Sequence, residues 1–461
     1  MTTKTKEDVL RLVKSKKIKD IQLWFTDILG FLKCFTITDD ELADALDYGK
    51  GFDGSSITGY AEAEESDIIA KPDPTTFQLL PWQPKDAPAG RMFCDILNPD
   101  GSPYPGDPRY ILKQNLRRAE QMGFVFCVGP ELEYFYFKSR EVPQIMDEGA
   151  YFDFIPNDMA NNLRRQTIDI LRKMEIPVEM SHHEVAPSQH EIDLHFSDAL
   201  TMADATVTYK MVVKEVAQKE GIHATFMPKP MFGVCGSGMH VHQSLFSARG
   251  RGATVGSRQQ AASSKKNLKN VFFDKKDKFH LSDIGKRFIA GQLKHSREIC
   301  SILAQWVNSY KRLVPGYEAP VYISWAQKNR TALIRVPFYR PDNEAAARIE
   351  LRCPDPACNP YLAFSVMLAA GLEGIEKRYK LPEPVEPNIY NMEPEEREYR
   401  GLKRLPVNLF EALKETEKSE LVKKALGEHI FTRFLHNKMK EWQEYATQVT
   451  SYEIRKYLSI L

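Results

Sequence analysis

The stretch from Val128 to Phe137 reads Val-Gly-Pro-Glu-Leu-Glu-Tyr-Phe-Tyr-Phe. Its aromatic and apolar residues favour a β-strand. Because successive side chains of a strand point to opposite faces, Glu131 and Glu133 share one face. Neighbouring acids beside an apolar run are costly to bury unless a positive group neutralises them. Taken alone, the stretch is therefore either a strand with a solvated face or a strand that holds a metal ion.

The same pattern recurs in further segments. The groups that share a face are His240, His242 and Ser244 in Met239–Phe246, and Arg348, Glu350 and Arg352 in Arg348–Arg352; the segment His182–Glu191 adds Glu184 and Glu191. A single histidine in such a place is more often structural than functional. Several strands that each direct charged groups to one side favour a shared site.

The kinds of residue in these segments predict the chemistry of that site. Carboxylates together with a single imidazole form a hard set of ligands, which suits Mg²⁺ or Mn²⁺ beside phosphates. Guanidinium groups match carboxylate and phosphate oxygens, although any single arginine could instead pair with a surface acid. The arginines concerned are Arg312, Arg330, Arg335, Arg348 and Arg352. Acids and arginines together indicate phosphoryl transfer, and the absence of a P-loop or kinase signature argues against those folds.

Composition and charge exclude several classes of protein. The chain has 461 residues, 43% of them hydrophobic and 27% charged, which is typical of a soluble globular protein, and its length favours two domains. A formal net charge of +1 gives no field that would recruit nucleic acid or an anionic membrane. The apolar stretch Tyr361–Leu372 is too short to span a bilayer, and the first residues do not form a signal peptide. The seven cysteines include no Cys-x-x-Cys pair and indicate reduced thiols. We expect a cytoplasmic protein that binds neither nucleic acid nor membrane.

Turn-forming residues divide the chain into two parts. The segment Asn98–Pro108 is rich in proline, glycine and aspartate, and it predicts a domain boundary at residue 103. Before it, we expect a small α/β unit with a helix over Glu7–Lys16 and strands over Ile21–Phe25 and Phe31–Ile37. After it, a helix over Arg109–Met122 and a buried strand over Phe124–Val128 are expected.

The segment Arg249–Asn270 differs from the rest of the chain in composition. It is rich in Gly, Ser, Gln and Ala, and it has basic residues but no acidic ones. We expect a mobile surface loop. A nucleic-acid patch is the alternative, but the segment lacks interleaved aromatic residues.

Five segments in order resemble class I glutamine synthetases, the glutamate–ammonia ligases. They are Phe52-Asp-Gly-Ser-Ser-Ile, Gly129-Pro-Glu-Leu-Glu, the stretch from Phe226 to His240 with its Gly-Ser-Gly-Met-His end, Asn308-Ser-Tyr-Lys-Arg-Leu-Val-Pro-Gly-Tyr-Glu-Ala-Pro, and Arg348-Ile-Glu-Leu-Arg with the Pro354–Tyr361 motif. They span most of the chain in the order of the family. The spacing of Glu184 and Glu191 and the short segment after Phe137 resemble the α subtype.

The resemblance implies a role for individual residues. The metal ligands would be Glu133, Glu184 and Glu191 for one ion and Glu131, His240 and Glu350 for the other. ATP would contact Glu179, Phe196, His242, Ser244, Arg335 and Arg348. Glutamate would lie near Cys235 and Gly236, with Arg312 on its α-carboxylate and Arg352 at the reacting end.

The resemblance also implies the reaction and the assembly. ATP and glutamate would form γ-glutamyl phosphate, with Arg330 stabilising the transferring group, and ammonia would then displace phosphate. Asp53, with Ser56 beside it, would attract and deprotonate ammonium, and Glu318 would shield the intermediate and accept a proton. The fold would be α+β: a β-grasp domain over 1–103, then a catalytic domain over 104–461 with a curved antiparallel sheet and flanking helices. The family forms dodecamers of two stacked hexamers, in which Asp53 would complete a neighbouring site and Tyr452–Leu461 would form a strap.

The chain departs from the family pattern at particular positions. Cys235 stands where the family usually has asparagine, and Glu62 stands where the α subtype commonly has an arginine linked to glutamine feedback. We therefore expect weak inhibition by glutamine and control by a regulatory protein or metabolite. Tyr390 aligns with a tyrosine that is adenylylated in the β subtype, and we expect it to be unmodified. A γ-glutamyl-amine ligase and a scaffold that has lost activity are the alternatives; Asp53, Ser56 and Glu318 favour ammonia, and the complete carboxylate set favours an enzyme.

Overall fold

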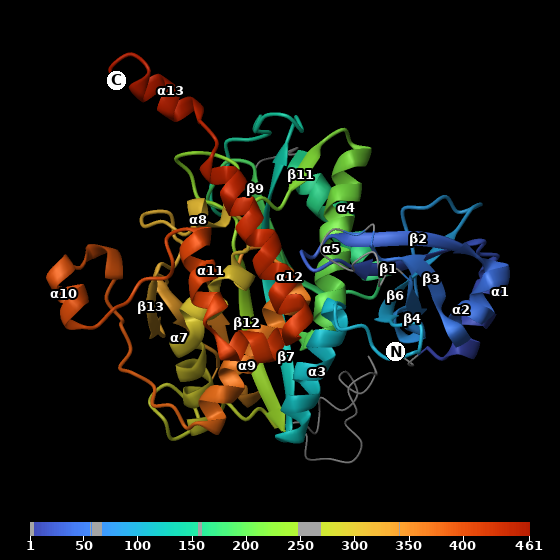
Figure 1. Ribbon diagram of the computed structural model, residues 1–461, viewed down its shortest axis with the longest axis horizontal. Coiled ribbons are helices and arrows are strands. Elements are labelled where there is room, and N and C mark those ends of the chain that lie inside the picture. The colour runs from blue at the N-terminus through green and yellow to red at the C-terminus, as the bar shows by residue number, and fades with distance from the viewer. Residues whose placement is uncertain (1–3, 56, 58–66, 155–158, 248–268, 341) are drawn as a thin grey trace.

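The computed structural model of the chain describes residues 4–55, 57, 67–154, 159–247, 269–340 and 342–461. Ser56, Glu62 and most of the basic segment Arg249–Asn270, for which we made predictions, lie outside the described residues. Figure 1 shows a small N-terminal sheet with two helices beside a larger body in which helices cover a long curved sheet.

The N-terminal part is a sheet with strand order β2-β1-β6-β4-β3, and β5 also pairs with β6. Its elements are α1 (Lys6–Lys16), β1 (Asp20–Thr26), β2 (Leu32–Thr38), α2 (Leu42–Tyr48), β3 (Lys50–Asp53), β4 (Asp67–Pro72), β5 (Gln78–Leu79) and β6 (Ala89–Leu97). Thr5 caps the start of helix α1, because its side chain accepts from the backbone N–H of Asp8 in a capping box. Lys17 caps the end of the helix in the left-handed conformation. The expected first helix and first two strands are confirmed to within a residue at each end.

The larger part is built on a sheet with strand order β13-β14-β15-β12-β7-β9-β8, to which β10 and β11 add by pairing with β7. Its strands are β7 (Phe124–Phe137), β8 (Val178–His183), β9 (Gln189–Leu194), β10 (Ser197–Asp198), β11 (His223–Thr225), β12 (Met239–Ser247), β13 (Tyr322–Ala326), β14 (Ala332–Arg335) and β15 (Ile349–Leu351). Strand β7 is continuous over 14 residues, so the buried strand expected at Phe124–Val128 and the acid-bearing stretch after it are one element.

The sheet departs in one place from the antiparallel arrangement that we expected. Strands β13 and β14 pair in parallel, whereas the other pairs of this sheet among the described residues are antiparallel. In the short link between them, Glu386 accepts from the backbone N–H groups of Gln327 and Lys328, each at 2.9 Å. The sheet is therefore mixed.

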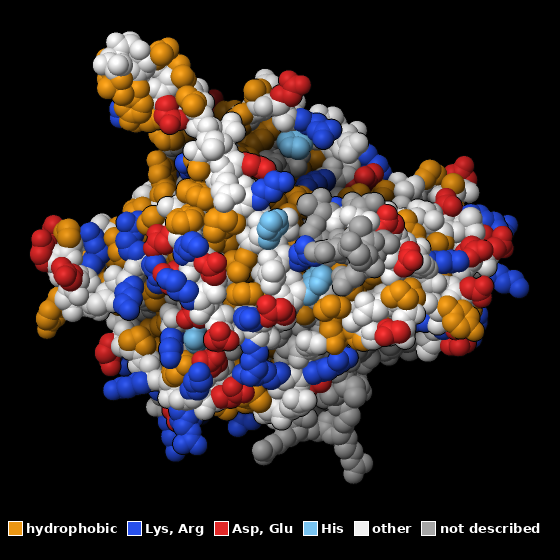
Figure 2. Space-filling view, in the orientation of Figure 1, with side chains coloured by type: hydrophobic (Ala, Val, Ile, Leu, Met, Phe, Trp, Pro, Cys, Tyr) orange, Lys and Arg blue, Asp and Glu red, His pale blue; other side chains and the backbone are white. Residues whose placement is uncertain are grey.

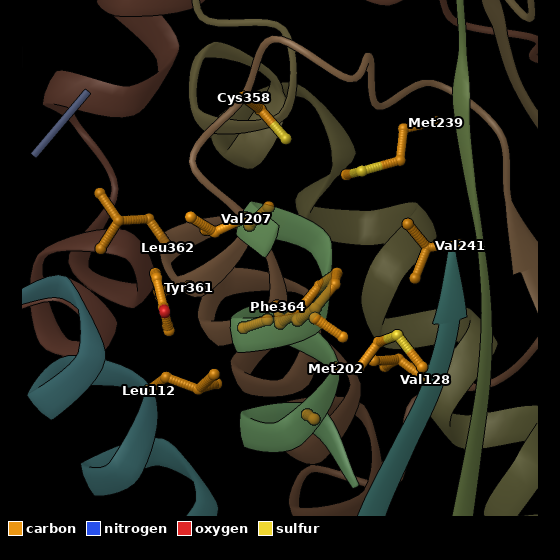
Figure 3. Packing of buried hydrophobic residues seen from close by; sticks show 14 of the residues in the cluster. Leu112, Val128, Met202, Val207, Met239, Val241, Cys358, Tyr361, Leu362 and Phe364 are labelled. Atoms are coloured by element: carbon orange, nitrogen blue, oxygen red, sulfur yellow. The ribbon is translucent and has the colours of Figure 1, made fainter. Parts of the chain in front are cut away.

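Helices pack against this sheet and form the main core. They are α3 (Pro108–Gln121), α4 (Met159–Lys173), α5 (Ala199–Lys219), α7 (Asp283–Leu303), α8 (Ser309–Arg312), α9 (Pro360–Glu376), α10 (Pro394–Tyr399), α11 (Leu409–Glu417), α12 (Glu420–Ala446) and α13 (Ser451–Tyr457). Figure 3 shows Phe364 of α9 beside Met202 of α5 and near Val128 and Val241 of the sheet. Helices α7 and α9 pack so closely that a Cβ added at Gly291 would collide with the backbone of α9. The apolar stretch Tyr361–Leu372 is thus a buried core helix.

A network of ion pairs joins the two parts of the chain. Arg109, buried at the start of α3, lies 2.8 Å from Asp73 and 2.5 Å from Asp95 of the N-terminal part. The same guanidinium pairs with Asp204 of α5 at 3.2 Å. Buried charges of this kind are tolerated when each has a partner, and removal of one partner is strongly destabilising. The network fixes the N-terminal sheet against the larger part.

The C-terminal helix α13 lies away from the body of the chain (Figure 1). Figure 2 shows that apolar side chains gather on this projection. The exposed ones are Tyr452, Ile454, Tyr457, Leu458, Ile460 and Leu461. None of the helices in the described part of the chain combines the length and the apolarity needed to cross a bilayer.

Candidate active site

The paired strands bring the predicted metal ligands into one cavity of about 220 Å³. Glu133 on β7 is the direct neighbour of Glu191 on β9, and Glu131 is the direct neighbour of His240 on β12. Since the strands alternate their side chains, these neighbours face the same side of the sheet. The cavity is lined by all six predicted ligands, namely Glu131, Glu133, Glu184, Glu191, His240 and Glu350.

The first group of ligands centres on Glu131. Its carboxylate lies 2.7 Å from Nε2 of His242 and 3.5 Å from Nδ1 of His240, and His240 lies 3.7 Å from Glu350. Burial raises the pKa of Glu131, but His242 and His240 outweigh this and hold the pKa well below its usual range. Burial also raises the pKa of Glu350, but Arg352 outweighs burial and lowers this pKa to about 2. Both carboxylates are therefore ionised and can bind a cation.

The second group centres on Glu184 and Glu191, with His182 between them. The two ring nitrogens of His182 lie 3.5 Å from Glu184 and 3.6 Å from Glu191. Burial and the nearby charge of Glu184 raise the pKa of Glu133 to about 8, and burial and Asp193 raise that of Glu191 well above its usual range. Like charges crowded in a buried cavity fit a divalent cation, which removes their repulsion, and the oxygen-rich donors are the type that Mg²⁺ and Mn²⁺ prefer.

Four arginines complete the wall of the cavity: Arg312, Arg330, Arg335 and Arg352. Arg352 lies 2.5 Å from Glu350, and Arg335 lies at the same distance from the other oxygen of that carboxylate. Arg312 is held differently, because its guanidinium donates to the carbonyl groups of Arg352, Cys353 and Pro354 at 2.9–3.1 Å. A Cβ added at Gly238 would collide with Nη2 of Arg312. The Gly-Ser-Gly sequence thus makes room for that arginine.

The mouth of the cavity carries the remaining predicted catalytic and substrate residues. Cys235, Gly236, Glu318 and Arg330 line it, and Glu318 adopts a left-handed backbone conformation with φ of 58°. A left-handed conformation in a non-glycine residue costs free energy and often occurs at functional sites. Burial and the nearby charge of Glu318 raise the pKa of the Cys235 thiol to about 11, so this cysteine is a neutral thiol.

The predicted ATP-binding residues continue from Arg335 along β12 and its neighbours. His242 links Glu131 to Arg348, whose Nε lies 3.3 Å from His242. Ser244 is buried and donates to the carbonyl of Ala347 at 2.9 Å. Phe196 stacks on Phe246 with parallel rings 6.2 Å apart, and Glu179 is exposed beside His195. Of these residues only Arg335 lines the cavity itself.

Asp53 lies apart from the cavity of its own chain. It is exposed at the end of β3, and it accepts hydrogen bonds from the backbone N–H of Ser55 at 2.9 Å and from the Ser55 hydroxyl at 2.6 Å. Ser56 lies outside the described residues.

Several cavity residues were missed by the sequence analysis. They are Tyr151, His182, Gln189, Asp193 and Tyr317. Gln189 and Asp193 share the alternating face of Glu191, so the period of the strand could have identified them. Burial and Glu131 raise the pKa of Asp193 to about 7. Tyr151 comes from the irregular segment after β7, where no sequence periodicity indicates the direction of a side chain.

Comparisons with known proteins agree with this arrangement. The family described as glutamine synthetase, catalytic domain, matches residues 105–457, and the family described as glutamine synthetase, beta-Grasp domain, matches residues 17–99. The expected β-grasp fold is therefore confirmed.

Relatives cover the whole chain. The glutamine synthetases of Methanosarcina mazei and Mycobacterium tuberculosis are each 49% identical over 461 residues, covering 99% of this chain and 98% and 99% of those proteins. The cryo-EM structure of Plasmodium falciparum glutamine synthetase has a TM-score of 0.85 at 25% identity, covering 99% of both chains. A complex of GmaS with ADP has a TM-score of 0.84 at 29% identity, covering 98% of this chain and 99% of the other. With both family domains matched and near-half identity along its length, the chain belongs to the glutamine synthetase family.

Proposed function

We propose that the chain is a glutamate–ammonia ligase of class I, most similar to the α subtype, which uses ATP to form glutamine through γ-glutamyl phosphate. The observation that carries this proposal is the cavity itself. Seven carboxylates, two imidazoles and four guanidinium groups line a cavity of about 220 Å³. Such a cavity suits a reaction in which two anionic substrates and a transferring phosphoryl group meet.

We propose two divalent cations, Mg²⁺ or Mn²⁺, for this site. Glu133, Glu184 and Glu191 would hold one, and Glu131, His240 and Glu350 would hold the other. When bound, such ions neutralise phosphate charge and orient the phosphoryl group for transfer. The fit is supported by the ionised state of Glu131 and Glu350 and by the crowding of acids around Glu133.

The substrates would occupy opposite ends of the cavity. ATP would lie along Arg335, Arg348, His242 and Ser244, with its base near the stacked rings of Phe196 and Phe246 and with Glu179 at its outer edge. Glutamate would lie at the Gly236 end, beside Cys235, with its α-carboxylate toward Arg312 and its side-chain carboxylate toward Arg352. Both arginines face this end of the cavity and are almost fully buried, which strengthens a charge-assisted hydrogen bond.

The residues of the chain would then act in two steps. In the first, the side-chain carboxylate of glutamate attacks the terminal phosphorus of ATP, the bond from that phosphorus to the bridging oxygen breaks and ADP leaves, while Arg330 stabilises the charge on the transferring oxygens. In the second, ammonium loses a proton to Asp53 of a neighbouring subunit, and the resulting ammonia displaces phosphate. Glu318, at the mouth of the cavity, covers the intermediate and accepts a further proton.

The division of labour between subunits calls for an oligomer. We propose a dodecamer of two stacked hexamers in the cytoplasm, with domains over residues 1–103 and 104–461. The exposed apolar face of α13 supports this assembly, because apolar patches of that kind usually become buried in an interface. The C-terminal helix would be the strap between the rings, and Asp53 would reach the adjacent site from the small sheet.

Phosphate release from ATP and glutamate tests the proposal. We expect release to depend on ammonium and on a divalent cation, and much less on bulkier amines at equal concentration. Release only with a bulkier amine would identify a γ-glutamyl-amine ligase instead. No release with any amine, from protein that is folded and assembled, would identify a scaffold or regulator.

A further inference from the structure

Three side chains meet behind the wall of the cavity. Asp147, from the segment that follows β7, lies 2.7 Å from Nε2 of His183 and 3.6 Å from Nε2 of His190. His183 on β8 and His190 on β9 are direct cross-strand neighbours, and their rings lie 4.7 Å apart. Both imidazoles are buried, with exposed fractions of 1% and 0%. We call these three residues the Asp147 cluster.

Aspartate and two histidines could bind a metal ion, but their hydrogen bonds exclude it here. Arg164 of α4 lies 2.6 Å from Nδ1 of His190, and because a guanidinium can only donate, the proton of this ring is on Nε2. Nδ1 of His183 lies 2.6 Å from the carbonyl of Glu184, so both nitrogens of His183 face acceptors and both carry protons. Neither ring presents a lone pair to the centre of the cluster. The cluster is an ion-paired hydrogen-bond network.

The network is tied to the turn that carries two of the proposed metal ligands. The Asp147 oxygen that contacts His183 also accepts from the backbone N–H of Ser188 at 3.0 Å and of Gly149 at 3.1 Å. Ser188 in turn accepts from the backbone N–H of Met146 at 2.7 Å. His183 directly precedes Glu184, and His190 directly precedes Glu191. Since neighbouring strand residues point to opposite faces, the side chain of His190 lies behind the sheet while that of Glu191 enters the cavity.

The cluster also holds the segment that delivers Tyr151 to the cavity. The backbone N–H of Phe152 donates to the carbonyl of His183 at 3.1 Å, and a Cβ added at Gly149 would lie 2.6 Å from Nε2 of His183. Tyr151 itself lines the cavity. One carboxylate therefore connects β8, β9 and the segment that covers them.

We infer that Asp147 is a positioning residue that fixes Glu184 and Glu191 in the geometry required to bind one of the two divalent cations. This inference rests on the proposed metal sites. Partners that orient metal ligands from behind typically change metal affinity by about 10- to 100-fold when they are removed. The second cation group, Glu131, His240 and Glu350, lies on other strands, so its affinity for a cation should stay the same.

Calorimetric titration of Mn²⁺ into the full-length, metal-free protein tests the inference. The variants are Asp147→Ala and Asp147→Asn, and Asp153→Asn is the matched control, because Asp153 lies on the same segment and is exposed, accepting from the N–H of Ala150. We expect Asp147→Ala to weaken one class of Mn²⁺ site by about 10- to 100-fold and to leave the other class unchanged. The effect of Asp147→Asn should be smaller, because its amide oxygen still accepts from Ser188 and Gly149 but does not neutralise His183. The control should titrate like the wild type.

Thermal unfolding of the same metal-free samples separates positioning from a general loss of structure. Unchanged affinity in the Asp147 variants, or equal weakening of both classes together with a lower melting temperature, would overturn the inference. If Asp147→Ala does not fold, unchanged affinity in Asp147→Asn alone overturns it. A wild-type protein with no Mn²⁺ binding would refute the proposed function, and this inference with it, before any variant is compared.

Discussion

Nε2 of His242 lies 2.7 Å from Oε1 of Glu131, although the family resemblance assigns His242 to ATP and Glu131 to a metal ion. The contact is possible because β12 and β7 are paired, with His240 directly opposite Glu131 and His242 opposite Gly129. His242 and Glu131 are therefore diagonal neighbours on the same face of the sheet, within reach of each other's side chains. The proposed nucleotide region and the first proposed cation group are therefore in direct contact, and a change in one should affect the other.

Removal of a carboxylate from this group should abolish activity. We expect Glu131→Ala or Glu350→Ala to lose one bound divalent ion per subunit and to lower kcat by about 1,000-fold, because a catalytic cation supplies several kcal/mol of transition-state stabilisation. Isothermal titration with Mn²⁺ gives the stoichiometry. Glu395→Ala on exposed α10 is the control. Unchanged stoichiometry would remove these residues from the site.

Asp53 should act only in the second step, in which ammonia displaces phosphate. We expect Asp53→Ala to lower glutamine formation at low ammonium by at least about 100-fold, which is typical of general-base catalysis, while part of the glutamate-dependent ATP turnover survives. Asp67→Ala is a close control, because Asp67 is the exposed cross-strand neighbour of Asp53. Full activity of Asp53→Ala at low ammonium would contradict the assignment.

The raised pKa of Glu133 predicts how pH and cations act together. Its folded pKa of about 8 exceeds the usual 4.5, so its contribution to the stability of the metal-free protein is present below about pH 4.5 and is lost as pH rises through about 8. A cation replaces that proton. The melting temperature of the metal-free protein should fall as pH rises over this range, and Mg²⁺ should raise it more at about pH 8.5 than at about pH 6.

Proton release provides a separate measurement of the same effect. Calorimetry of Mg²⁺ binding in two buffers with different ionisation enthalpies should show protons released at neutral pH. Glu350, with a pKa of about 2, is already ionised and contributes none. Binding without proton release near neutral pH would mean that Glu133 is ionised before the cation arrives.

Gly238 should be required for glutamate binding. A Cβ at this position collides with Nη2 of Arg312, which cannot move away easily because three backbone carbonyls hold it. We expect Gly238→Ala to lower kcat/KM for glutamate by about 100-fold, as a displacement of about 1 Å at an active site can do. Gly285→Ala, in a helix where an added Cβ meets its neighbours at 3.4 Å, is the control. An unchanged KM for glutamate would remove Arg312 from the substrate site.

Tyr390 should be free of nucleotide in the native host. Its hydroxyl donates to the carbonyl of Ala319, next to Glu318, and burial raises its pKa to about 12. A modifying enzyme would have to break this hydrogen bond and would disturb the mouth of the cavity. Intact-mass spectrometry of native protein should give the unmodified mass, and an adduct of one nucleotide would contradict this prediction.

Much of the site could be predicted because a strand has a fixed period. Alternation placed Glu131 and Glu133 on one strand face and Glu350 on another, and the cavity contains all three. The helices expected at Glu7–Lys16 and Arg109–Met122 are α1 and α3, and the structure shows that Thr5 and Asp107 cap their starts. Assignments to ATP, glutamate and ammonia came from resemblance, and they stay predictions until the variants are measured.

The sequence by itself determined which side chains share a face, where helices begin and end, and that acids and arginines face a common side. These are consequences of local backbone geometry, which each segment carries within itself. Only the tertiary structure decided that Asp147 joins His183 and His190, that Tyr151 and His182 enter the cavity, and that β13 pairs with β14 in parallel. Those facts depend on which strands become neighbours and on the paths of irregular segments. Both are set by packing between residues far apart in the chain, and no local period encodes them.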